Sequence, residues 1–186
     1  MNQIEFLRDT VAPQLKAFGK SGLEYYGFSV LMQCIEVTGS LFDTKLIDDF
    51  GQSENRFRKG FERLFPAAEY SGLWKTFFTE LRGPMIHQLR PAWDFTLASE
   101  TRVPREFHFQ RDKQMQTILV FEKMVEEFET GLKGIADSIE NGILSEEIDV
   151  SKLQGRYITI YSLPQELQAG NSMSLGLSSR PNYEPD

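Results

Sequence analysis

A histidine follows an arginine with four residues between them near the middle of the chain, in the run RGPMIH at residues 82–87. An imidazole has an ordinary pKa near ~6.5, so it can accept a proton from a hydroxyl or donate one to a leaving oxygen at neutral pH. A guanidinium presents a planar fork of donors that matches a phosphate. Arg82 and His87 are therefore the candidate site for acid–base chemistry at a phosphate group.

An arginine shortly before a histidine is a weak signal by itself, because Arg102 and His108 form a second such pair, with five residues between them. That second pair lies in a stretch where apolar and polar residues alternate, and Pro104 interrupts the stretch. It does not fall at the end of a helical pattern. We therefore favour Arg82 and His87.

The composition leaves few other chemistries open. With one cysteine, Cys34, and two histidines, the chain lacks the ligands of a zinc ribbon, an iron–sulfur protein or a disulfide scaffold. The sequence also lacks a glycine-rich phosphate loop, a GxSxG elbow, an HExxH motif and an EF-hand calcium loop. Neither a metal nor a cofactor is expected, and Cys34 is expected to be a core residue.

Four helical segments are expected to position the candidate pair. Apolar residues recur at three- and four-residue steps over residues 3–18, 22–42, 53–65 and 67–82. The second segment is apolar around so much of its circumference that it should lie at the centre of the fold. Glu36 is the exception within it. Because an unpaired buried carboxylate is costly, Glu36 should face a gap or pair with a basic side chain.

The hydrophobic period changes in the second half of the chain. Residues 93–109 alternate apolar and polar side chains, which predicts a short β-hairpin. Residues 114–140 return to a helical period, with an apolar seam sustained for three heptads at Ile118, Phe121, Val125, Phe128, Leu132, Ile135 and Ile139. Such a seam suits a bundle helix or a dimer interface, and we favour the bundle helix. Residues 157–161 predict one more short strand.

The expected fold is all-α: a bundle of about five helices, with a β-hairpin excursion between the fourth and fifth helices and a short C-terminal strand. A length of 186 residues suits one compact domain. We place that domain at residues 1–163, and the polar composition that follows predicts a weakly packed tail over residues 164–186. Since no apolar run is long enough for a membrane span and the first residues are unlike a signal peptide, we expect a cytoplasmic protein that does not enter a membrane.

The formal net charge of −7 is unfavourable for binding nucleic acid. Residues 53–113 are the exception, because this part of the chain holds more basic than acidic residues and also contains the candidate pair. Its basic side chains are expected to meet a phosphate backbone weakly and with strong salt dependence. They include Arg56, Arg58, Lys59, Arg63, Lys75, Arg82 and Arg90.

The motif and its helical setting resemble the HEPN superfamily, whose pattern is an arginine, four to six residues and a histidine. The resemblance covers about residues 1–145, through IEVTGSLF at the end of an apolar helix and LWKTFFTELR before the motif. It implies a metal-independent ribonuclease, of a toxin or RNA-processing type, whose two subunits bring their pairs together at a homodimer interface. His87 would be the general acid and base, and Arg82 would stabilise the pentacoordinate phosphate. The candidates for contacts to the RNA backbone are Gln88, Arg90 and Lys75. An antitoxin-type protein is a candidate partner.

The dipeptide Gly83-Pro84 departs from the family pattern, in which a polar residue usually follows the arginine. Proline cannot donate a backbone hydrogen bond and bends or restarts a helix. On a straight α-helix Arg82 and His87 would lie about 140° apart. The geometry at the dipeptide therefore decides whether the two side chains meet.

Two alternatives to an enzyme stay open. One is a catalytically inactive HEPN-like module that binds a nucleotide or a protein. The other is a plain structural or interaction bundle, in which Arg82 pairs with an acid such as Glu36 or Glu80 and His87 is a structural residue at a helix junction.

Overall fold

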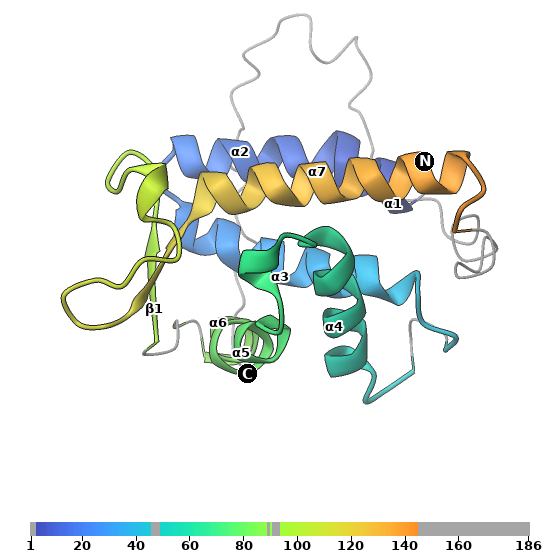
Figure 1. Ribbon diagram of the computed structural model, residues 1–186, viewed down its shortest axis with the longest axis horizontal. Helices are drawn as coiled ribbons and strands as arrows, with labels where there is room; N and C mark the ends of the chain where they lie inside the picture. Colours follow the sequence, from blue (N-terminus) through green and yellow to red (C-terminus); the bar gives the residue numbers. More distant parts are fainter. Residues whose placement is uncertain (1–2, 46–48, 89, 91–93, 145–186) are drawn as a thin grey trace, which may run out of the picture.

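The computed structural model describes residues 3–45, 49–88, 90 and 94–144, and this part of the chain is mostly helical (Figure 1). Helix α3 (Glu24–Ser40) lies at the centre. Helices α2 (Ala12–Lys20) and α7 (Phe121–Glu140) run side by side along one side of α3. Helix α4 (Ser53–Leu64) crosses α3, and the short helices α5 (Trp74–Thr76) and α6 (Gly83–Gln88) lie away from α2 and α7. The expected helical class and the central position of residues 22–42 are confirmed.

Two glycines let α3 and α4 approach until their backbones touch. A Cβ atom on Gly39 would lie 1.7 Å from the carbonyl oxygen of Arg56, and one on Gly60 would lie 1.9 Å from the carbonyl oxygen of Ile35. No side chain fits at these separations. The crossing therefore depends on glycine at both positions. It fixes the position of α4 relative to the part of α3 that carries Glu36.

The core is rich in aromatic side chains from three parts of the chain. Phe57 and Phe61 of α4 are buried, as is Phe77, and Phe61 and Phe77 have ring centroids 5.0 Å apart. Tyr70, in the 3₁₀ turn η2 (Ala68–Tyr70), packs against Phe61 at 6.0 Å. Offset and edge-on ring contacts of this kind add to the stabilisation from burial. They fix the segment that leads into the candidate motif.

In the described part of the chain, both helices that contain a proline widen into a π-helical turn just before it. The turn η1 (Leu7–Val11) links α1 (Gln3–Phe6) to α2 and precedes Pro13, and the turn η3 (Phe77–Arg82) precedes Pro84. In an α-helix a proline ring collides with the carbonyl group four residues earlier. In the wider turns, the amide of Ala12 donates to the Leu7 carbonyl and that of Gly83 to the Phe78 carbonyl, each five residues back. The helices therefore continue through both prolines.

The expected β-hairpin is not confirmed. Strands β1 (Phe95–Ala98) and β2 (Thr117–Val120) pair in parallel, with Phe95 opposite Thr117. A parallel pair needs a long connection, and here residues 99–116 supply it. Residues 106–109 are the stretch expected as the second strand, and the first two of them lie in the 3₁₀ turn η4 (Arg105–Phe107), directly after Pro104. Residues 117–120, expected as helix, are rich in β-branched side chains, which favour a strand.

The apolar seam expected on the long helix lies inside the chain. Its side chains are buried at Phe121, Val125, Phe128 and Leu132, and Ile118 is buried in β2. The interpretation as a bundle helix is therefore confirmed for the described residues, and this stripe is not free to form a dimer. The strand expected at 157–161, the domain boundary at 163 and the tail over 164–186 lie outside the described residues. Within the part of the chain that the structure describes, no helix has the length and apolarity of a membrane span.

Candidate functional site

The structure brings Arg82 and His87 together. Arg82 is the last residue of η3 and His87 lies in α6, and Nη1 of the guanidinium is 3.4 Å from Nε2 of the imidazole. The approach depends on the junction at Gly83, where the π turn passes into α6, and on the reach of the arginine side chain. Because a guanidinium can only donate, Nε2 of His87 accepts in this contact, and a neutral His87 carries its proton on Nδ1.

Glu36 of α3 anchors the guanidinium from the other side. Its Oε2 atom accepts hydrogen bonds from Nε of Arg82 at 3.1 Å and from Nη2 at 2.6 Å. The side chains of Arg82 and Glu36 are only 15% and 21% exposed, so water screens this ion pair less than one on an open surface. The expectation that Glu36 would pair with a base is confirmed, and Nη1 is left as the group nearest to His87.

The ion pair forms one wall of a cleft of about 240 Å³ between α3, α4 and α6. The cleft is lined by Gln33, Glu36, Val37, Ser40, Arg56, Arg82 and Ile86. Arg56 does not offer an open charge there. Its Nε donates to Asp43 at 2.9 Å, and both side chains are almost fully buried. Burial alone would raise the pKa of the Asp43 carboxyl, but hydrogen bonds from Arg56 and from the Lys45 amide hold that pKa below its usual value. Arg56 thus belongs to the core.

The three expected backbone-contact residues lie on the surface, apart from this ion pair. Gln88 and Arg90 follow His87 and bind each other, with 2.6 Å between Nε of Arg90 and Oε1 of Gln88. Lys75 is exposed on α5, seven residues before Arg82. Among the described residues, no hydrogen bond or ion pair joins any of the three to Arg82 or His87.

The second histidine is part of a polar chain inside the fold that the sequence pattern did not reveal. Nδ1 of His108 accepts from the Val120 amide at 3.0 Å, and Nε2 lies 3.0 Å from the hydroxyl of Tyr70. The Tyr70 hydroxyl donates to Glu127, which also pairs with Lys123 at 2.7 Å. With Nδ1 accepting, Nε2 carries the proton and donates to Tyr70. The imidazole therefore ties the β1–β2 connection to η2 and α7.

Arg102, the other half of the second match, is not beside His108. It pairs instead with Glu24 at 3.2 Å. Burial lowers the pKa of His108 to about 4, so its imidazole stays neutral at neutral pH. His108 is thus a structural residue, as its place in the alternating stretch suggested.

Folding stability is expected to fall as the pH drops from about 6.5 to 4, because the unfolded chain then binds a proton that folded His108 resists. The loss assigned to His108 should be roughly 2 kcal/mol, less than the full shift implies because the ring is partly exposed. Urea unfolding at pH 7 and pH 4.5 measures it. His108→Gln should lose less stability over this interval than the parent protein. Equal losses in the parent and His108→Gln would contradict this assignment.

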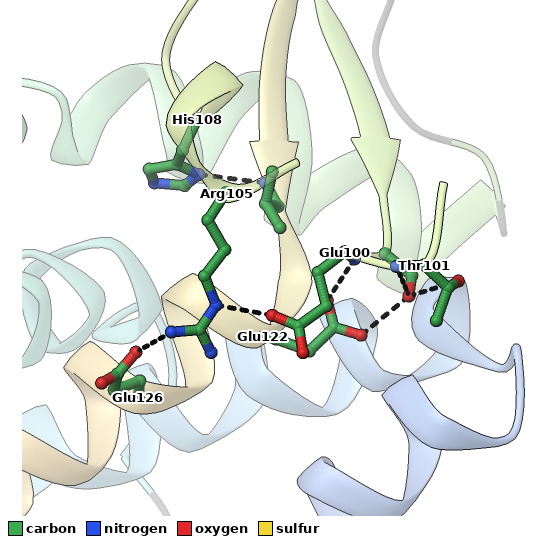
Figure 2. Close-up of polar contacts among 8 residues, drawn as sticks. Glu100, Thr101, Arg105, His108, Glu122 and Glu126 are labelled. Atoms are coloured by element: carbon green, nitrogen blue, oxygen red, sulfur yellow. Dashed lines mark hydrogen bonds and ion pairs between the residues drawn. The ribbon is translucent and has the colours of Figure 1, made fainter. Parts of the chain in front are cut away.

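A larger cleft of about 420 Å³ lies between α2, α7 and the β1–β2 connection. Charged groups surround it, and several of them are paired with one another (Figure 2). Arg105 bridges Glu100 at 2.5 Å and Glu126 at 2.8 Å, and Glu122 accepts from the Ser99 hydroxyl and the Glu100 amide. These pairs brace the connection against α7. Among the described residues, no group of histidine, cysteine and acidic side chains could hold a metal ion.

Comparisons with known proteins found no relative of this chain. No family model matches the chain, no curated protein matches it, and no solved structure matches its fold.

Proposed function

We propose that the chain is a metal-independent endoribonuclease of the HEPN type, with Arg82 and His87 at its active site. The observation that carries the proposal is the 3.4 Å approach of the Arg82 guanidinium to the His87 imidazole, in a junction where a straight helix would separate them. Glu36 strengthens the case, because it holds the guanidinium through Nε and Nη2 and leaves Nη1 beside the imidazole. A phosphate at Nη1 would thus lie next to a group that can move a proton.

The proposed reaction is attack by a ribose 2′-hydroxyl on the adjacent phosphorus. The 2′-oxygen–phosphorus bond forms while the bond to the 5′-oxygen breaks, so the products end in a 2′,3′-cyclic phosphate and a 5′-hydroxyl. One imidazole accepts the 2′-hydroxyl proton, and a protonated imidazole supplies the proton that the 5′-oxygen needs. Arg82 stabilises the extra negative charge on the phosphate oxygens.

Because one His87 cannot hold both protonation states at once, the proposal includes a homodimer that supplies two. A partly apolar stripe on α3 supports it. Tyr26 is 58% exposed, and Val30 and Val37 are half-buried. Ile86, also half-buried, lines the same cleft as Val37. A second copy covering this stripe would meet the surface next to Arg82.

A non-catalytic nucleotide-binding or protein-binding module is the second candidate. The observation that favours it is the ion pair itself, since Glu36 occupies two of the donors that Arg82 would offer to a phosphate. The family pattern usually has a polar residue after the arginine, and glycine at position 83 also favours this non-catalytic module.

The deciding experiment incubates the purified protein with single-stranded RNA in excess EDTA. We expect cleavage to fragments with 2′,3′-cyclic phosphate ends, and no cleavage of the matching DNA, which lacks the 2′-hydroxyl. Size-exclusion chromatography with light scattering at the assay concentration should show a dimer. Intact RNA, or cleavage only with added divalent metal, would refute the ribonuclease and leave the binding module.

A further inference from the structure

A row of cations stacked on aromatic rings leads away from the candidate site. Cζ of Arg82 lies 5.5 Å from the ring centroid of Phe78, and Cζ of Arg58 lies 5.9 Å from that of Trp74. Trp74 and Phe78 are four residues apart, so the two pairs are about one helical turn from each other along α5 and η3. His87 therefore lies at one end of the row and the Arg58–Trp74 pair at the other.

The Arg58–Trp74 pair combines an indole that packs on the core with a guanidinium group on an exposed residue. Trp74 is half-buried and packs on the core, while Arg58 is exposed on α4. Phe57, next to Arg58, packs on Phe78 with centroids 5.5 Å apart, which sets α4 against this helix. Nη2 of Arg58 also donates to Asn55 at 3.3 Å. The guanidinium thus lies over the indole, and Arg58 remains exposed to solvent.

This arrangement suits a nucleobase. Guanidinium planes and indole rings both stack on bases, and such stacking tolerates any sequence because every base has a π face. A base in a duplex is already stacked on its neighbours, so the preferred ligand is a single strand. Exposed Lys75 adjoins Trp74 in the chain and adds a positive charge for the backbone.

We propose that Arg58 and Trp74 form a base-stacking subsite, which holds an unpaired nucleotide of the RNA strand whose scissile phosphate lies at Arg82 and His87. Arg82 lies eight positions after Trp74, about 12 Å along a helix axis. The base at this subsite therefore belongs to a nucleotide near the cleaved bond. The inference rests on the proposed ribonuclease for the position of the strand, but binding of the base can be measured without cleavage.

The experiment follows the fluorescence of Trp74 in a Trp93→Phe background, where Trp74 is the only tryptophan. The probe is a short single-stranded DNA, which lacks the 2′-hydroxyl and so is not cut. We expect it to quench Trp74, and an abasic strand of equal length to quench it far less. Arg58→Ala should weaken binding of the probe by about tenfold. The matched control is Arg8→Ala, an exposed arginine in η1 that pairs with Asp9, and it should leave binding unchanged.

Thermal melts confirm that each variant is folded. Trp74→Phe, which keeps an aromatic ring, should bind the probe more tightly than Trp74→Leu. Because both of these variants lack the Trp74 signal, their binding is followed by the fluorescence anisotropy of a dye-labelled strand. Equal quenching by the base-bearing and abasic strands would overturn the subsite, because phosphate contacts alone would then explain binding. RNA cleavage that depends on His87 but is indifferent to Arg58→Ala, with no quenching, would overturn the subsite and leave the ribonuclease standing. Base-dependent quenching without cleavage would support the subsite and refute the catalytic proposal.

Discussion

Replacing His87 with alanine is expected to lower the rate of RNA cleavage in EDTA by at least ~100-fold. General acid–base catalysis by a positioned side chain typically contributes 10²–10⁴-fold. The chain has two histidines, and of these only His87 is exposed. His108 is held inside the fold, where burial lowers its pKa to about 4. No second imidazole of the same chain can take over. Initial rates on a fluorescent single-stranded RNA measure the effect.

The exposure of His87 also makes this variant informative. Among the described residues its imidazole has one hydrogen bond, the long contact to Arg82, so the fold should melt at nearly the same temperature without it. Added free imidazole should restore part of the activity of His87→Ala and should not stimulate the parent protein, a readout that a purely structural role would not move. Cleavage that survives His87→Ala would assign the activity to another group or to a contaminant.

The ion pair of the candidate site was within reach of sequence reasoning because both partners carried a local signal. Arg82 ends an amphipathic segment next to the motif, and Glu36 is an isolated acid on an apolar helix. A buried carboxylate needs a basic partner, and Arg82 at the end of an amphipathic segment was a candidate for that partner. The sequence did not decide the geometry of the junction at Pro84, because a proline can bend a helix or be accommodated in a wider π-helical turn.

The network around His108 carried no such signal. Tyr70 lies 38 residues before His108 and 57 residues before Glu127, so no periodic pattern links them. The parallel strands were missed for a similar reason. Alternation in residues 93–109 indicates extended chain but says nothing about the partner strand, and β2 is too short to stand out from the helix that follows it. Long-range pairing decided both features.

Replacing Gly60 with alanine is expected to destabilise the protein by about 3 kcal/mol or more. The added methyl would lie 1.9 Å from the carbonyl oxygen of Ile35, a backbone atom that cannot rotate away. Forcing a group into a packed interior commonly costs 1–3 kcal/mol, and here α3 and α4 must separate along their crossing. The gain in helix propensity, about 1 kcal/mol, is too small to offset this cost. Urea unfolding followed by circular dichroism measures the difference.

Gly134→Ala on α7 is the matched control, because a Cβ there meets no atom within 4 Å. It should raise the free energy of unfolding by about 0.5–1 kcal/mol through helix propensity alone. The same exchange thus has opposite signs at the two positions, and a Gly60→Ala protein as stable as its parent would disprove the tight crossing. Ile35 directly precedes Glu36, so the shift that accommodates Gly60→Ala also moves the carboxylate that anchors Arg82. Residual folded Gly60→Ala protein should therefore cleave RNA more slowly per folded molecule, whereas Gly134→Ala should cleave at the parent rate.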